Sequence, residues 1–108
     1  MLGAVEMNQG LTIRHGDLLI DLIHDRVLLA DQPLILSYRE YALLVMLATQ
    51  PGHVISKRRL LEEGMGRHDP GGMRMVDEHI RHLKSKLEHE GRVLIQEIEG
   101  TGYKFVRP

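Results

Sequence analysis

Apolar residues recur at helical spacing in one basic stretch of the chain, from Met73 to Leu87. When this stretch is wound at about 100° per residue, one stripe collects Val76, Ile80, Leu83 and Leu87. The opposite face collects Arg74, Glu78, Arg81, His82 and Ser85, and its flanks carry His79, Lys84 and Lys86. The pattern predicts a helix that packs one face on a core and presents donors for phosphates and base edges on the other.

Two β-prone runs follow this helix, between Val93 and Phe105. They flank Gly100-Thr101-Gly102, a composition typical of a tight hairpin turn. A donor-rich helix followed by a small β wing indicates a domain that reads DNA.

The first third of the chain alternates short apolar runs with turn formers. The runs are Leu11–Arg14, Leu18–Asp21, Val27–Ala30 and Leu34–Leu36. This alternation predicts a four-stranded antiparallel sheet. Residues 1–10 are expected to be a lead-in or linker, and residues 11–108 to form the domain.

Two further helices are predicted between this sheet and the basic helix. Ser37 and Glu40 have the spacing of a capping box and precede an apolar run that ends at Pro51-Gly52. After a brief extended piece at Val54-Ile55, Ser56 is a candidate N-cap for a helix from Lys57 to about Met65. Four strands, three helices and a final hairpin describe an α+β domain.

Composition limits the chain to one such domain. Its 108 residues, 43% apolar and 27% charged, can bury a single modest core. There is no cysteine, which excludes disulfides and thiolate metal sites. No apolar run approaches the roughly 18 residues that span a bilayer, and the N-terminus has no signal-peptide pattern, so a cytoplasmic protein without a membrane partner is expected.

The net charge of −1 hides an uneven distribution. Residues 1–36 hold two basic and five acidic residues, a balance of −3. Residues 52–86 hold eight basic and five acidic residues, a balance of +3. Such a polarised chain can orient its basic part toward a polyanion despite the near-neutral sum.

Four blocks in this order resemble the winged-helix DNA-binding domain of OmpR/PhoB-type response regulators. The resemblance runs from about Leu11 to Val106, through blocks at Leu36–Leu44, Gly52–Leu61, Arg74–Leu87 and Ile95–Phe105. It implies a winged helix-turn-helix with the N-terminal four-stranded sheet, three helices and a C-terminal hairpin wing. It also implies double-stranded DNA as the partner, with the third helix in the major groove.

The resemblance assigns roles to individual residues. Phosphate or groove contacts are implied for Arg74, His79, Arg81 and Lys84, base-reading positions for Glu78 and His82, and a phosphate contact for Tyr103. Ser85 lies on the same exposed face, and Lys57 and Arg58 begin the second helix, where added cations can hold phosphate. The wing departs from the family pattern, because Glu99 stands where an arginine is common and Glu97 lies nearby. These carboxylates predict a weaker contribution of the wing to DNA affinity.

The resemblance also bears on assembly. The segment Gly66–Gly72 corresponds to a loop that family members can present to RNA polymerase. No coiled-coil heptad is left over for a dimer seam, so the free domain is expected to be monomeric, with head-to-tail pairing plausible on DNA. The family's receiver domain is absent from this chain, which suggests an excised fragment.

The same residues do not predict a metal site or a catalytic site. His79 and His82 are three apart on a helix, but no third ligand lies near them in sequence, so neither a metal site nor another cofactor is predicted. No serine has the base and acid of a nucleophilic triad, so no enzyme is expected. The alternative function, favoured by the acidic wing, is a winged-helix protein-interaction module with weak or lost DNA affinity.

Overall fold

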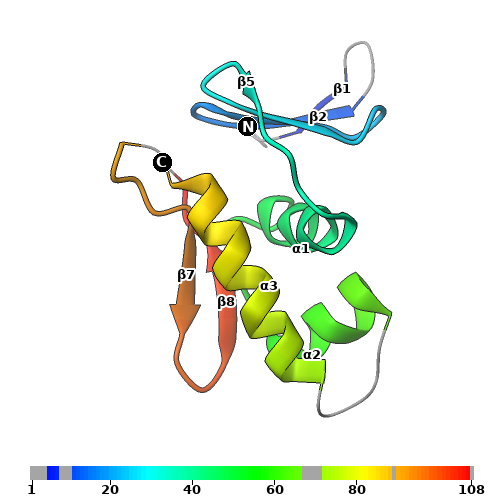
Figure 1. The fold of residues 1–108 in the computed structure, drawn as a ribbon, viewed down its shortest axis with the longest axis vertical. Helices are drawn as coiled ribbons and strands as arrows, with labels where there is room; N and C mark the ends of the chain where they lie inside the picture. Colours follow the sequence, from blue (N-terminus) through cyan, green and yellow to red (C-terminus); the bar gives the residue numbers. More distant parts are fainter. Residues whose placement is uncertain (1–4, 8–10, 67–71, 89, 108) are drawn as a thin grey trace.

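The chain folds into an N-terminal antiparallel sheet, three helical segments and a C-terminal three-stranded sheet. The computed structural model describes residues 5–7, 11–66, 72–88 and 90–107. In Figure 1 the N-terminal sheet lies at one end, α1 lies beneath it, and α3 crosses in front of the hairpin β7–β8 at the other end. The predicted α+β winged-helix architecture is confirmed.

The N-terminal sheet has its strands in chain order. They are β1 (Val5–Met7), β2 (Leu11–His15), β3 (Leu18–Asp21), β4 (Arg26–Leu29) and β5 (Gln32–Pro33). Strand β1 lies inside the predicted lead-in and pairs with β2, which adds a strand that the apolar pattern does not indicate. Alternate side chains on β2–β4 enter the core, and Ile13 faces Ile20 across the ladder.

The last strand of this sheet differs from the prediction, which placed it at Leu34–Leu36. Ala30 and Asp31 both have positive φ, at 51° and 64°, the signature of a tight type I′ turn. Pairing therefore resumes at once, with Gln32 opposite Leu29, and β5 ends at Pro33. The following residues run on toward the first helix.

Helix α1 (Tyr38–Ala48) begins at the predicted capping box. The amide of Glu40 donates to Ser37 Oγ (3.1 Å), and the amide of Ser37 donates to Glu40 Oε1 (2.9 Å). Leu43, Leu44 and Leu47 are fully buried. The helix thus forms the centre of the core.

The second helix spans the predicted residues but changes its winding. Ser56, at the end of β6 (Val54–Ser56), caps α2 (Lys57–Arg59) by accepting from the amide of Arg59 (3.1 Å). The chain then widens into a π-helical turn, η1 (Leu60–Gly64), whose Leu60 and Leu61 are buried. A side chain at Gly64 would meet Met46 of α1 at 2.9 Å, so glycine permits this close approach.

Helix α3 (Gly72–Leu87) has the predicted phase. Val76, Ile80, Leu83 and Leu87 are all buried, as the apolar stripe requires. The wing that follows consists of β7 (Ile95–Ile98) and β8 (Gly102–Phe105). Within the described ranges, no helix is long and apolar enough to cross a bilayer.

The short strand β6 completes the wing sheet, in the order β6-β8-β7. A Cβ at Gly102 would overlap the carbonyl oxygen of Ile55, so β6 and β8 can approach only because this residue is glycine. The entry to α2 is thereby joined to the wing.

His15 joins the two sheets through the first helix. It is buried, its Nε2 lies 2.9 Å from the carbonyl oxygen of Ala48 at the end of α1, and its ring lies 4.6 Å from that of Phe105. One side chain of β2 therefore contacts both the end of α1 and β8. This side chain thus links the N-terminal sheet to the wing sheet.

Candidate nucleic-acid interface

The face of α3 opposite the core is formed by five exposed side chains. They are Arg74, Glu78, Arg81, His82 and Ser85, all predicted to lie here. Across the described residues, none of these five forms a hydrogen bond or ion pair with another side chain. Their polar groups are therefore available to a ligand.

The flanks of α3 are partly covered. His79 and Lys84, on opposite sides of the helix, are half-buried. Lys86 is engaged with the start of α1: its Nζ donates to Glu40 Oε1 (2.7 Å) and to the carbonyl oxygen of Ile35 (3.1 Å). This lysine anchors the end of α3 to the start of α1.

The start of α2 separates the two cations predicted there. Arg58 is exposed and lies 3.8 Å from Glu62, one turn further on. Lys57 is half-buried and turns toward α3 and the wing, where its Nζ lies 3.1 Å from Asp77 Oδ1 and 3.7 Å from Glu97 Oε2. Arg58 remains accessible, whereas the charge of Lys57 is balanced within the domain.

Asp77 is the centre of this internal network. It accepts a 2.6 Å hydrogen bond from the Tyr103 hydroxyl in addition to its contact with Lys57. The Lys57 ammonium also lies over the Tyr103 ring, 5.9 Å from its centroid. One carboxylate on α3 therefore holds both the start of α2 and the wing.

The same network includes Tyr103, whose expected phosphate contact stays a prediction. Its side chain is buried, and burial, the Asp77 hydrogen bond and the nearby Glu97 raise the pKa of the hydroxyl, which stays a protonated donor. Its proton is directed to Asp77, and donation to a phosphate would require this bond to break. In the free domain Tyr103 positions the wing.

Sequence reasoning missed Asp77, Lys86 and His15. Asp77 lies 20 residues from Lys57 and 26 from Tyr103, so no local spacing relates them. The contact of Lys86 with Glu40 spans 46 residues. His15 follows the predicted run Leu11–Arg14, and the one available signal was its position two residues after Ile13, because alternate residues of a strand share a face.

A groove of about 540 Å³ separates α3 from the wing. It is lined by Asp77, Ile80, Arg81, Lys84, Ser85, Glu88, Glu97 and Tyr103. The α3 side supplies the cations Arg81 and Lys84 together with the carboxylates of Asp77 and, just past its end, Glu88. The wing side supplies the carboxylate of Glu97. Glu97 and Glu99 are both exposed on the wing, so a polyanion meets attraction from α3 and repulsion from the hairpin.

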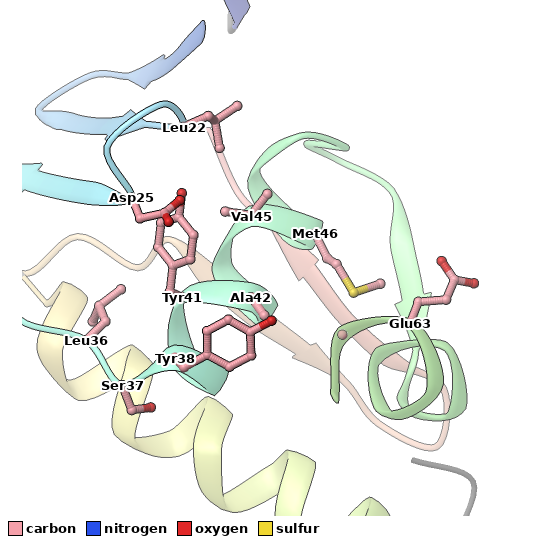
Figure 2. A pocket seen from close by; sticks show the side chains of 11 residues that line it. Leu22, Asp25, Leu36, Ser37, Tyr38, Tyr41, Ala42, Val45, Met46 and Glu63 are labelled. Atoms are coloured by element: carbon pink, nitrogen blue, oxygen red, sulfur yellow. The ribbon is translucent and has the colours of Figure 1, made fainter. Parts of the chain in front are cut away.

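A second hollow, of about 550 Å³, lies between α1, η1 and the turn after β3 (Figure 2). Its walls include the rings of Tyr38 and Tyr41 and the carboxylates of Asp25 and Glu63. Figure 2 shows Tyr41 pointing toward Asp25; burial and this carboxylate raise the pKa of Tyr41 to about 12. None of the predicted DNA-contacting residues lines this hollow.

The predicted polymerase-facing segment, Gly66–Gly72, falls largely outside the described residues. Only its two ends are described: Gly66, after η1, and Gly72, the first residue of α3. The prediction for this segment therefore stays untested.

Comparison with known proteins identifies relatives among transcriptional regulatory proteins. The family model described as "Transcriptional regulatory protein, C terminal" matches residues 31–105. The phosphate regulon transcriptional regulatory protein PhoB of Klebsiella pneumoniae is 38% identical over 87 residues, which cover 80% of this chain and 38% of that protein. Transcriptional regulatory protein SrrA of Staphylococcus aureus is 38% identical over 89 residues, covering 80% and 37%. The chain thus spans less than two fifths of these relatives.

Solved structures of DNA-binding domains have a similar fold. The RstA DNA-binding domain of Klebsiella pneumoniae, in complex with the RstA box, superposes with a TM-score of 0.79 at 31% identity, covering 88% of this chain and 96% of that one. The DNA-binding domain of CpxR from E. coli superposes with a TM-score of 0.80 at 28% identity, covering 89% and 96%. Both likenesses extend over nearly the whole neighbouring domain.

Proposed function

Because the chain belongs to the OmpR/PhoB-type transcriptional regulators, as their C-terminal effector domain, we propose that it binds double-stranded DNA sequence-specifically. Helix α3 would enter the major groove, and the wing and the start of α2 would lie beside the flanking backbone. The chain would act as the output domain of a two-component regulator and would have no enzymatic activity. The complex of the related RstA domain with its box supports this proposal.

The exposed face of α3 is the observation that carries the proposal. Arg74 and Arg81 are solvated, and no carboxylate among the described residues pairs with either. A guanidinium that is free in the unbound domain can hold a phosphate or a guanine edge without first breaking an internal bond. His82 and Ser85 add further groups for hydrogen bonding on the same face.

The other predicted contacts divide into direct and supporting groups. Arg58 at the start of α2 and the half-buried His79 and Lys84 would contact backbone phosphates. Lys57 and Tyr103, held by Asp77, would fix the angle between α3, α2 and the wing. The free domain would be a monomer, with head-to-tail pairing on DNA and an RNA polymerase contact through Gly66–Gly72.

A duplex titration at two salt concentrations tests the proposal. Each phosphate neutralised releases counterions, so the logarithm of the binding constant should fall linearly with the logarithm of salt concentration. Fluorescence anisotropy on a set of duplexes should show at least one that binds well above the rest. An affinity that is equal for every duplex, or unaffected by salt, would contradict sequence-specific binding.

A second candidate function is contact with another protein through the α1 hollow. Tyr38 lines this hollow with 83% of its surface exposed, and Ile35, 80% exposed, lines a neighbouring hollow that shares Tyr41 with it. Exposed large apolar side chains gathered in one region are typical of interaction surfaces. This function would become the primary one if the titration detected no salt-dependent DNA binding.

A further inference from the structure

We propose that Glu78 makes α3 select cytosine at the base pair facing the middle of the helix. The inference rests on the proposed DNA-binding function and names the base that this chain requires at one position. It follows from the placement of a single carboxylate on the outermost line of α3.

Glu78 lies almost directly opposite the buried stripe. With α3 wound at about 100° per residue, the four buried residues centre near 10° from Val76, and Glu78 lies at about 200°. Ser85 is the only other residue as close to this crest, at about 180° and about 10 Å further along the axis. The arginines lie to one side, with Arg74 at about 160° and Arg81 at about 140°.

This placement separates base-facing from backbone-facing groups. A helix about 10–12 Å across fills a major groove about 12 Å wide, so its crest meets the base edges and its flanks meet the two phosphate ridges. The cations on the flanks suit the phosphates. The carboxylate is at the point farthest from both ridges, where repulsion by phosphate is weakest.

The carboxylate is also free to accept a hydrogen bond. Glu78 is exposed, and although Arg74 and Arg81 are one helical turn away, neither pairs with it within the described part of the chain. An ionised carboxylate accepts and cannot donate. Once water is displaced, it needs a donor on the base edge, because an unpaired buried charge is costly.

Only one base satisfies this requirement without an opposing group. Cytosine presents the N4 amino donor in the major groove, whereas guanine presents two acceptors and thymine presents an acceptor and a methyl group. Adenine offers its N6 donor beside the N7 acceptor, which would repel the second carboxylate oxygen. Cytosine is therefore the base that Glu78 selects.

Selection of bound duplexes from a randomised pool tests this inference with three proteins. The parent should require cytosine at one position of each half-site by about tenfold over thymine. Glu78→Gln should shift that position toward adenine, because an amide can both donate to N7 and accept from N6. Glu78→Ala should make the four bases about equally frequent at that position and leave the base frequencies at the neighbouring positions unchanged.

A matched control is Glu63→Gln, which removes the same charge from η1, away from the exposed face of α3. Selection with Glu63→Gln should enrich the same DNA sequence motif as selection with the parent. If Glu78→Ala also returns the parent's motif, the inference is overturned while DNA binding stands. If the parent enriches no motif and binds without salt dependence, the proposed function fails as well.

Discussion

The hydroxyl of Tyr103 on β8 donates a 2.6 Å hydrogen bond to Asp77 on α3, and this bond fixes the wing against the helix proposed to enter DNA. The acceptor carries a charge, and the donor lies in a buried side chain. Hydrogen bonds to charged groups are worth more than neutral ones. Removing the hydroxyl should therefore have a measurable effect on folding.

We expect Tyr103→Phe to lower the free energy of unfolding by about 1–2 kcal/mol, because the ring stays packed while the charged hydrogen bond is lost. Urea denaturation followed by circular dichroism measures the change. Tyr38→Phe is the matched control, since that ring is 83% exposed and its loss of a hydroxyl should leave the midpoint unchanged. Equal midpoints for Tyr103→Phe and the parent would mean that the Asp77 bond contributes nothing.

Gly102→Ala should destabilise the domain by about 3 kcal/mol or more, because its methyl group would push β6 away from β8. Gly100→Ala provides the contrast. Gly100 has open space around it and a φ of +75°, so only the backbone conformation is strained, at a cost of about 1–2 kcal/mol. Thermal melts should rank the two variants in this order, and the reverse order would contradict the close approach of the strands.

Arg81→Ala should weaken binding to the selected duplex by about 1–3 kcal/mol and leave the melting temperature nearly unchanged, because the guanidinium is solvated in the free domain. Arg14→Ala, at an exposed position on β2, removes the same charge from the opposite end of the fold. It should leave affinity almost unaltered. If Arg81→Ala binds every duplex as tightly as the parent does, α3 is not the helix that reads DNA.

Glu99→Arg should tighten DNA binding generally and steepen its salt dependence, because it replaces an exposed wing carboxylate with a cation. The comparison uses titrations at several salt concentrations, with Glu99→Gln to separate loss of repulsion from gain of attraction. The slope should increase from the parent through glutamine to arginine. A slope that is the same for all three proteins would place the wing tip away from the DNA.

Stability should fall with acid partly through Glu40. Burial raises the pKa of this carboxyl, but the Lys86 ammonium and the Ser37 amide and hydroxyl outweigh burial, so the net shift is below the usual value of 4.5. A folded-state pKa below the unfolded one contributes stability above the unfolded value, and this is lost as the pH falls through the folded value. Urea midpoints between pH 7 and about pH 3 should therefore decline less steeply for Glu40→Gln than for the parent. Parallel curves would contradict the ion pair with Lys86.

Much of the secondary structure was accessible from the chain because its signals are local. The capping box at Ser37 and Glu40, the N-cap at Ser56 and the apolar stripe from Val76 to Leu87 each depend on residues within a few turns of one another. The exposed face of α3 followed from the same periodicity. The ends of the strands were harder to predict from the sequence. Strand β1 forms by pairing with β2, and β5 forms by pairing with β4. Neither β1 nor β5 has a strong apolar pattern of its own.

The sequence by itself therefore determined the three helical segments, the hairpin and which side of α3 faces outward, since helical phase and turn chemistry are set by neighbouring residues. Tertiary structure alone decided which polar groups remain free on that face. It turns Lys57 and Tyr103 inward to Asp77 and binds Lys86 to Glu40, while Glu78, Arg74 and Arg81 stay unpaired in the described residues. The physical reason is distance along the chain: these partners are 20 to 46 residues apart, and only packing brings their charges within hydrogen-bonding range.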